Sequence, residues 1–380
     1  MIGTRPQTPT PPVTGSLAEQ WNALALGGGT PFMTYEWLDA WEAAFGDGAC
    51  ERIMLRDAQG GLRACTCIVR AGRGRLASTT NSHSPDWELL AADDASRREL
   101  ARALITKGAA RVQLQGMLQD GPGAAALVDE LAAGGYRTVR EPGPFCPWLS
   151  LPGTWEELSA AISGSLRSQV RRRRKMLERE GELRFRVGGQ GAELERDLES
   201  FLRIEASGWK GRDGTAILSR PETARLYREF AQAAAERGWL RLYFLELDGA
   251  TIAADYDCAF GGTSYFMKTG FDERHARLSP GLVLRAEVLR SSIEEGLTGY
   301  DFLGEPDTYK TRWTAERRPR LALWAYRREA LGGYAYRKRL RPLLKAARDR
   351  AAELRERRGG SGSESLKASS VTDKGKEPKR

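Results

Sequence analysis

Residues that hold metals or form disulfides are scarce in this 380-residue chain, which contains five cysteines and two histidines. Cys65 and Cys67 lie two residues apart in a strand-like stretch, but no second pair of ligands accompanies them. Zinc modules need such a second pair, and disulfide-stapled secreted domains carry an even and denser set of cysteines. We therefore expect no metal site, and reduced thiols in a cytoplasmic protein.

Long apolar runs are missing as well. No stretch approaches the roughly 20 apolar residues of a membrane-spanning helix, and the N-terminal MIGTRPQTPTPPVTG lacks the apolar centre of a signal peptide. We expect residues 1–15 to form a disordered leader. Hydrophobic residues make up 41% of the chain and charged residues 29%, which is typical of a soluble globular protein, and the length suits two domains.

The body of the chain has no excess of charge of either sign. Residues 331–380 contain fifteen Lys or Arg and six Asp or Glu, which accounts for the entire net charge of +9. A polyanion-binding body is therefore not required, and nucleic acid is not expected as a partner. We expect a basic helix over residues 331–358, followed by a disordered tail over 359–380.

The predicted basic helix carries an apolar stripe. Its members are Tyr336, Leu340, Leu344, Ala347, Ala351 and Leu354. Such a stripe leaves two alternatives open, which are packing on the second domain and peripheral contact with an anionic membrane.

Strand-like and helix-like segments alternate along the chain, which predicts an α/β layered fold. The proline-rich phrase PGPFCPWLSLPGTWEEL marks a boundary near residue 150, so we expect one domain over 16–150 and another over 151–330. In the second, Asp-Gly and Gly-Gly pairs divide WLRLYFLELDGATIAADYDCAFGGTSYFMKTGF and predict hairpin turns. The central sheets are therefore expected to be mixed and largely antiparallel, with helices on their faces.

The phrase LSPGLVL opens the helix that follows these hairpins. Ser279 suits the N-cap position, Pro280 suits the first helical position, and Gly281 has no side chain to block a ligand. Free amides of Gly281, Leu282 and Val283, together with the helix dipole, would favour a phosphate group. The same residues also suit an ordinary helix start, and the phrase alone does not separate the two interpretations.

Five phrases spread over residues 31–330 carry a family resemblance. They are PFMTYEWLDAWEAAFG, SGWKGRDGTAI, YFMKTGFDE, LSPGLVL and GYDFLGEPDTYKTRW. Together they resemble the CelD-type acetyltransferase domain family of the GNAT superfamily, although the superfamily's usual Q/R-x-x-G-x-G/A loop is replaced by Ser-Pro-Gly. The resemblance implies two tandem GNAT-like domains, as in the related Fem-type transferases, with an acyl-CoA site in the second domain.

The resemblance also implies a reaction. An amine or hydroxyl of the acceptor attacks the thioester of acetyl-CoA or another acyl-CoA directly, without a metal. Amides of the strand before the cofactor helix, here Met267, Lys268 and Thr269, would polarise the thioester carbonyl. The implied acceptor is a small molecule or glycan precursor, with an envelope or polysaccharide role as one option.

Because the chain has only two histidines, carboxylates are candidates for the base that deprotonates the acceptor. Asp255 and Asp257 lie on one face of a strand, where proximity would raise one pKa, unless that face is the exposed side of an edge strand. Asp301 begins the next strand and is either a base or a cap. Tyr309, with an ordinary pKa of about 10, is a candidate acid for the leaving thiolate, or it packs beside Trp313.

Acceptor binding has four further candidates. Trp209 and Lys210 lie in a glycine-rich segment, and Lys310 either binds an acidic group or faces solvent. In SGSLRSQVRRRRKMLEREG, Arg173 falls on the apolar stripe of its predicted helix. It therefore needs a carboxylate, a phosphate or an anionic acceptor as a partner, unless its side chain reaches solvent at the margin of the stripe.

Two rival functions remain. A Fem-like transferase that uses aminoacyl-tRNA predicts a helical-hairpin insertion and a basic body, whereas residues 221–238 fit a single helix and the body is neutral. A non-catalytic adaptor would bind nucleic acid or a membrane through the basic tail. The sequence favours an acyl-CoA-dependent acyltransferase over both.

Overall fold

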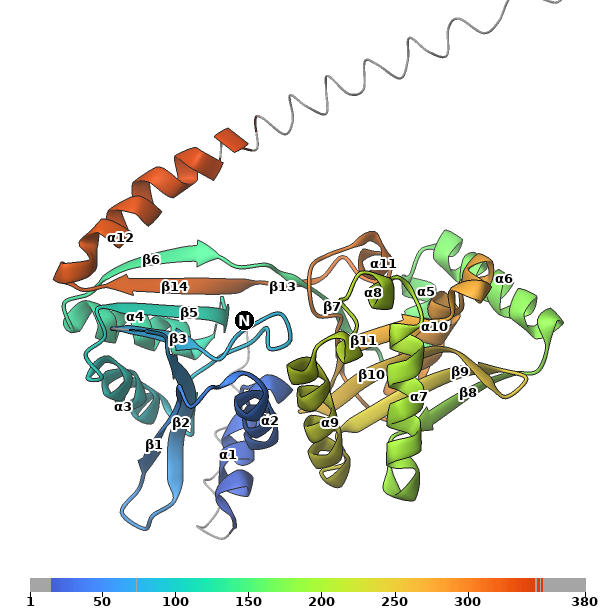
Figure 1. The fold of residues 1–380 in the computed structure, drawn as a ribbon, viewed down its shortest axis with the longest axis horizontal. Helices are drawn as coiled ribbons and strands as arrows, with labels where there is room; N and C mark the ends of the chain where they lie inside the picture. Colours follow the sequence, from blue (N-terminus) through green and yellow to red (C-terminus); the bar gives the residue numbers. More distant parts are fainter. Residues whose placement is uncertain (1–14, 73, 120, 346, 349, 351–380) are drawn as a thin grey trace, which may run out of the picture.

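The computed structural model describes residues 15–72, 74–119, 121–345, 347, 348 and 350. Two seven-stranded sheets, each flanked by helices, form two units that lie side by side (Figure 1). The expected α/β fold class with mixed, largely antiparallel sheets is confirmed. The predicted tail lies outside the described residues, as does the predicted leader except for residue 15. No helix in the described part of the chain is long and apolar enough to span a membrane.

The first unit contains a sheet in the order β1-β2-β3-β5-β14-β6, with β4 paired to β2. Helices α3 and α4 pack on the sheet through an aliphatic core. Its strands are β1 (Cys50–Arg56), β2 (Leu62–Arg70), β3 (Arg75–Ser78), β4 (Leu90–Ala91), β5 (Arg111–Leu118), β6 (Arg137–Pro142) and β14 (Arg320–Tyr326). Its helices are α1 (Leu17–Leu26), α2 (Tyr35–Phe45), α3 (Asp94–Ile105) and α4 (Pro122–Ala133).

The second unit contains a sheet in the order β13-β7-β12-β11-β10-β9-β8. Its strands are β7 (Cys146–Ser150), β8 (Leu183–Gly188), β9 (Leu240–Leu247), β10 (Ala250–Phe260), β11 (Thr263–Phe271), β12 (Gly299–Asp301) and β13 (Arg317–Arg318). Its helices are α5 (Trp155–Ala161), α6 (Gly164–Glu180), α7 (Leu194–Ala206), α8 (Trp209–Arg212), α9 (Pro221–Glu236), α10 (Pro280–Glu294) and α11 (Thr308–Thr311). The predicted hairpins join β9 to β10 and β10 to β11.

The chain crosses between the units, which corrects the predicted boundaries of 16–150 and 151–330. β7 belongs to the second sheet, where it pairs with β12 and β13. β14 returns to the first sheet and lies between β5 and β6. The alternating apolar residues of β14, such as Leu321 and Leu323, are buried in the core of the first unit, so their burial favours this return.

β10 is an inner strand whose two faces carry different layers. Ala254, Tyr256 and Cys258 face the core formed with α7 and α9. The intervening positions face the opposite layer, in which α10 covers the sheet and α6 packs on α10. Residues two apart in β10 therefore share a face, as the pleat of a strand requires.

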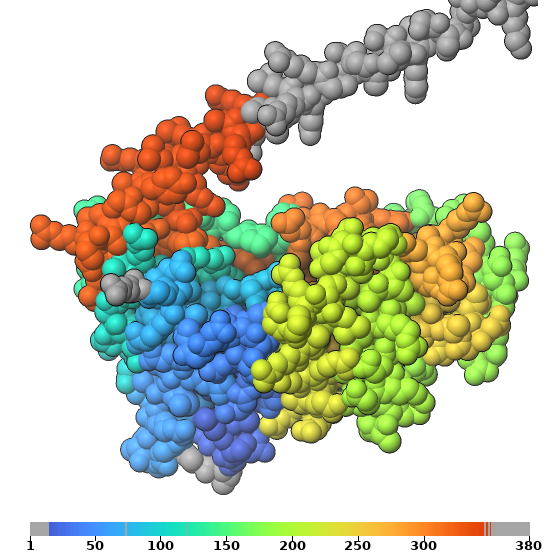
Figure 2. Space-filling view, in the orientation of Figure 1, coloured from blue at the N-terminus to red at the C-terminus, as the bar shows by residue number. Residues whose placement is uncertain are grey.

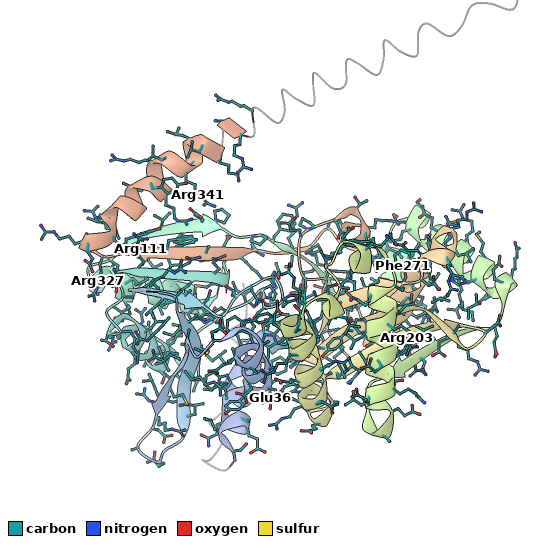
Figure 3. The ribbon with its side chains drawn as sticks, in the orientation of Figure 1. Glu36, Arg111, Arg203, Phe271, Arg327 and Arg341 are labelled. Atoms are coloured by element: carbon teal, nitrogen blue, oxygen red, sulfur yellow. The ribbon has the colours of Figure 1, made fainter. Side chains whose placement is uncertain are left out.

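The two units share one of these cores through α2 and α9. Trp37 of α2 is fully buried, with its ring 4.7 Å from that of Phe230 on α9 and its indole nitrogen donating to the Ser84 hydroxyl at 3.2 Å. Glu36 of α2 pairs with Arg237, just beyond α9, at 2.8 Å, and Figure 3 shows Glu36 on the side of α2 toward the second unit. The packing of Trp37 thus sets how the first unit meets the second.

Replacing Trp37 with alanine is expected to lower the free energy of unfolding by about 3–5 kcal/mol, because the change opens a large cavity in the shared core. Urea denaturation followed by circular dichroism measures the shift. Leu26→Ala is the matched control, since Leu26 is 57% exposed and its truncation leaves the midpoint nearly unchanged. Equal midpoints for the two variants would contradict the role assigned to Trp37.

Candidate active site

β11 parts from its neighbour β12 partway along the second sheet. It pairs with β10 over nearly its whole length, whereas its parallel pairing with β12 covers only Thr263 to Tyr265. β12 ends at Asp301, and the chain then turns away before α11. The β12 side of β11 is therefore free of strand pairing from residue 266 onward.

A cleft with a volume of about 370 Å³ follows this free edge. Its walls come from both units, since Phe32, His83 and Pro85 of the first unit face β11 and the residues after β12. The lining residues that the sequence also predicts are Trp209, Lys210, Met267, Lys268, Thr269, Tyr309 and Lys310. The structure thus brings predicted acceptor residues and predicted thioester residues to one place.

Lys268 presents a partly desolvated amine in this cleft. Its Nζ atom lies 5.3 Å from the centre of the Tyr227 ring. Burial, together with the positive charge of Lys210, lowers the pKa of Lys268 to about 8, although Glu205 opposes the shift. The neutral amine is therefore far more abundant at neutral pH than it is for an ordinary lysine, and a neutral amine can accept a proton.

His83 enters the cleft from the loop between β3 and β4. Its Nδ1 atom lies 3.4 Å from the Tyr227 hydroxyl, and its ring stacks on Phe45 with centroids 5.9 Å apart. Burial, followed by the positive charges of Lys268 and Arg220, lowers the pKa of His83 to about 4. The imidazole is therefore neutral near pH 7. Sequence reasoning sets the histidines aside, and no signal in the sequence places His83 beside Lys268.

The other two lysines of the cleft are anchored to backbone carbonyls. Lys210 donates through Nζ to the carbonyl of Thr269 at 2.6 Å and lies 3.3 Å from Glu205. Lys310 donates to the carbonyl of Leu303 at 2.9 Å. Both cations are thus held in place at the wall, and their contact with an acidic acceptor stays a prediction.

Trp209 lies at the rim of the cleft, where its side chain is half exposed. Its amide donates to Glu273 at 2.8 Å, and Arg212 pairs with the same carboxylate at 2.8 Å. Glu273 begins the short 3₁₀ helix, Glu273–Leu278, that leads from β11 to α10. The rim of the cleft is therefore tied to the segment directly before the predicted phosphate site.

The first turn of α10 is open at Gly281, where an added Cβ atom would meet no atom within 4 Å apart from the chain neighbours of Gly281 and the backbone of the helix itself. Ser279 takes the N-cap position, but its φ is 53° and its side chain makes no capping hydrogen bond, which corrects the expectation of a side-chain cap. The amide of Leu282 donates to the Ser279 carbonyl at 3.0 Å, so it is not free. Of the three predicted residues, Gly281 is half-buried, whereas Leu282 and Val283 are buried.

Asp255 and Asp257 do share a face of β10, but that face is buried under α10 and not exposed at an edge. Both carboxylates face Arg285 of α10, with Nη2 lying 2.8 Å from Asp255 and Nη1 lying 4.0 Å from Asp257. Tyr300 donates to Asp257 at 2.8 Å. Burial raises the pKa of both aspartates, and Arg285 opposes the rise.

Neither aspartate lines the cleft, so the structure places them as partners of Arg285 beneath it. The guanidinium of Arg285 also lies 3.7 Å from the centre of the Phe266 ring on β11. Sequence reasoning misses Arg285. A direct role of Asp255 or Asp257 as the base stays a prediction.

Tyr309 connects this buried charge cluster to the cleft. Arg285 donates through Nε to the Tyr309 hydroxyl at 3.3 Å, and Tyr309 lines the cleft. Burial raises the pKa of Tyr309, while the positive charge of Arg285 lowers it. The hydroxyl is therefore protonated at neutral pH and oriented by Arg285, as an acid for a thiolate must be.

Asp301 is buried at the junction between the units and not in the cleft. Its carboxylate lies 3.3 Å from Arg318 and 3.6 Å from Arg320, and it accepts the amide of Leu303 at 2.9 Å. Burial raises the pKa of Asp301, and Arg320 opposes the rise. These contacts match the alternative in which Asp301 caps the connection. Its role as a base stays a prediction.

Arg173 finds its partner at a backbone carbonyl. Its guanidinium donates to the carbonyl of Arg277, in the last turn before α10. Arg174 pairs with Glu287 of α10. The arginine run of α6 therefore contacts both the turn before α10 and the middle of α10, and Arg173 does not line the cleft that would hold the acceptor.

Replacing Arg285 with methionine is expected to cost about 3–5 kcal/mol of stability near neutral pH, because two buried carboxylates lose their cation. Losing Arg285 raises the pKa of both aspartates further, so they bind protons more readily in the folded variant than in the unfolded chain. The gap in melting temperature between variant and wild type is thus expected to be wider at about pH 8 than at about pH 5.

Arg203→Met is the control for this variant. Arg203 lies on the exposed side of α7, where Figure 3 labels it. The control is expected to melt like the wild type at both pH values. A gap for Arg285→Met that stays constant with pH would overturn the assignment of the two aspartates as its charge partners.

The sequence of the second unit matches a known family. Residues 164–311 match the acetyltransferase (GNAT) domain. This range contains α6, the hairpins of β9 to β11, α10 and Tyr309, and therefore most of the geometry described above. No curated protein matches the sequence.

Solved structures with a similar fold cover both units. FemX matches with a TM-score of 0.56 and 14% identity over 86% of this chain and 99% of its own. The C-terminal domain of a putative lysylphosphatidylglycerol synthetase from Agrobacterium fabrum matches with a TM-score of 0.53 and 12% identity over 81% and 90%. A conserved protein of unknown function from Bacteroides thetaiotaomicron matches with a TM-score of 0.54 and 12% identity, over 82% of this chain and 96% of its own.

At these identities the solved structures establish the fold alone. The domain match concerns residues 164–311 of the second unit, and the solved structures show that the two-unit fold resembles that of FemX. The CelD-type resemblance within that superfamily stays a prediction.

Proposed function

We propose that this protein transfers an acetyl or other acyl group from acyl-CoA to an amine or hydroxyl of an acceptor by direct attack on the thioester. The observation that carries this proposal is the cleft along the free edge of β11, where Lys268 and Tyr309 face the same space. An amine with a lowered pKa and a protonated phenol are the base and the acid that such an attack requires.

The donor would be held at two places. The diphosphate of acyl-CoA would lie at the start of α10, where Gly281 leaves open space and the helix dipole attracts an anion. The thioester arm would follow β11, so that an amide among Met267, Lys268 and Thr269 polarises its carbonyl. Glu273 supports this arrangement, because it ties the rim of the cleft to the segment before α10.

The proposed step forms a bond between the acceptor nitrogen or oxygen and the acyl carbon, and it breaks the bond between that carbon and sulfur. The amine of Lys268 takes the proton of the acceptor, and the hydroxyl of Tyr309 gives a proton to the departing thiolate. We favour Lys268 over the three aspartates as the base because Lys268 lines the cleft and the aspartates do not. Trp209, Lys210 and Lys310 would border the acceptor.

The Fem-like alternative is favoured by one observation, the similarity of the whole fold to FemX. Its aminoacyl-tRNA donor predicts a helical-hairpin insertion. In the described chain the segment after residue 220 is the single helix α9, followed directly by β9. We therefore keep acyl-CoA as the first donor to test, and a small molecule or glycan precursor as the acceptor.

Acetyl-CoA is expected to raise the melting temperature of the wild-type protein, and Gly281→Glu is expected to abolish this rise. A glutamate there places a bulky anion where the diphosphate would bind. Gly281→Gln has the same length without the charge, so it should retain part of the response. Differential scanning fluorimetry measures all three proteins, and an undiminished response of the glutamate variant would refute the proposed diphosphate site.

The pH profile of kcat/KM is expected to rise through an apparent pKa near 8 and then level off, because the base works only as the neutral amine. Lys268→Arg keeps the positive charge but cannot deprotonate, so it should lower kcat/KM by about 10²–10⁴-fold and remove the rise. Thiol release from acyl-CoA measures both, once an acceptor screen has found a substrate. An unchanged profile in Lys268→Arg would return the role of base to the aspartates.

A further inference from the structure

The helical segment over residues 331–345, here called the C-terminal helix, is attached to the body through its basic side chains. Arg337 pairs with Glu141 of β6 at 2.7 Å, and its guanidinium lies 3.2 Å from the centre of the Trp324 ring. Arg341 pairs with the same glutamate. The side of this helix that contacts the first sheet therefore carries arginines.

The apolar side chains of the C-terminal helix are exposed. Leu343 is 69% exposed, Leu340 and Leu344 are each 55% exposed, and Tyr336 is 48% exposed. These four residues recur at a spacing of three or four, so they lie along one side of the helix. A surface helix of a globular protein buries such a side against its core. In the C-terminal helix the apolar side faces solvent instead. The sequence left open that this helix packs on the second domain, but in the structure it contacts β6 and β14 of the first unit.

The position of the C-terminal helix explains why its apolar side chains are exposed. It begins beside β6 and β14 and then rises away from the body (Figure 1). Figure 2 shows this segment standing off the surface of the first unit, and Figure 3 shows Arg341 on it. Pro342 lies inside the segment, two residues after the end of the π-helical turn Tyr336–Leu340. Such a turn accommodates a residue that lacks an amide hydrogen, so the helix continues past the proline.

The charge of this segment selects a partner. Residues 331–345 contain five Lys or Arg and no Asp or Glu, while the chain before residue 331 has no net charge. An exposed apolar side flanked by cations matches the interface of an anionic bilayer, where leucines enter the acyl boundary and basic side chains remain among the headgroups.

We propose that the C-terminal helix is a membrane-surface anchor that places the protein on anionic lipid, with Leu340, Leu343 and Leu344 inserted. A second copy of the helix is a poorer occupant, because the charged residues of this segment are all basic and two such segments would repel each other. A nucleic acid would engage the cations and leave the leucines in water. This proposal does not depend on the proposed acyl transfer.

The full chain is expected to sediment with vesicles of phosphatidylcholine and phosphatidylglycerol, and not with vesicles of phosphatidylcholine alone. Replacing Leu340, Leu343 and Leu344 together with serine should weaken this binding by about tenfold or more, because apolar insertion is lost. A separate Leu343→Trp variant should show a blue shift of its additional emission on the anionic vesicles, which reports entry of that position into the bilayer.

The matched control replaces three exposed apolar residues of the body, Leu26, Leu218 and Met54, with serine, and it should bind like the wild type. The wild-type protein should also lose most of its binding at about 1 M salt, where the Debye length falls to about 3 Å. The proposal is overturned if the full chain ignores anionic vesicles, or if the leucine variant binds them as well as the control. It is also overturned if the leucines instead prove to hold a dimer in solution.

Discussion

The ion pairs between Arg285 and the two aspartates of β10 link α10 to the second sheet, and the positions of the site residues around them depend on this link. Arg285 is fully buried on the side of α10 that packs on the sheet, where a guanidinium is tolerated only beside anions. Asp255 and Asp257 supply those partners from an inner strand, and their contacts favour the orientation in which Arg285 faces the sheet. The first turn of α10 and the hydroxyl of Tyr309 take their positions from that single arrangement.

The cleft depends equally on how the two units meet. His83 and Phe32 reach β11 because α2 of the first unit packs on α9 of the second, with Trp37 buried between them. The first unit is therefore part of the site wall and not a separate module. Burial in this cleft is the main cause of the lowered pKa of Lys268.

Features that depend on local sequence patterns could be predicted from the sequence. Features that depend on how deeply a helix is buried, or on packing between the two units, could not. The hairpins, the start of α10 and the grouping of residues 209, 268 and 309 follow from turn residues, capping residues and a family resemblance. Arg285 falls on an apolar stripe by the same criterion that singles out Arg173. The two arginines differ because α10 packs directly on the sheet, whereas α6 packs on the outer side of α10. The spacing of apolar residues in a sequence does not show how deeply a helix is buried. His83 could not be found, because its contact requires both units in place.

The return of β14 to the first sheet affects how the chain matures on the ribosome. β5 and β6 are each hydrogen-bonded to β14 and not to one another. The strand between them is therefore missing from the sheet until the segment Arg320–Tyr326 has been synthesised. A nascent chain that has emerged only as far as the second unit exposes two unpaired strand edges, which are templates for mispairing. The first unit therefore cannot complete its sheet until β14 has followed the whole second unit out of the ribosome, whereas every strand of the second sheet precedes β14 in the chain.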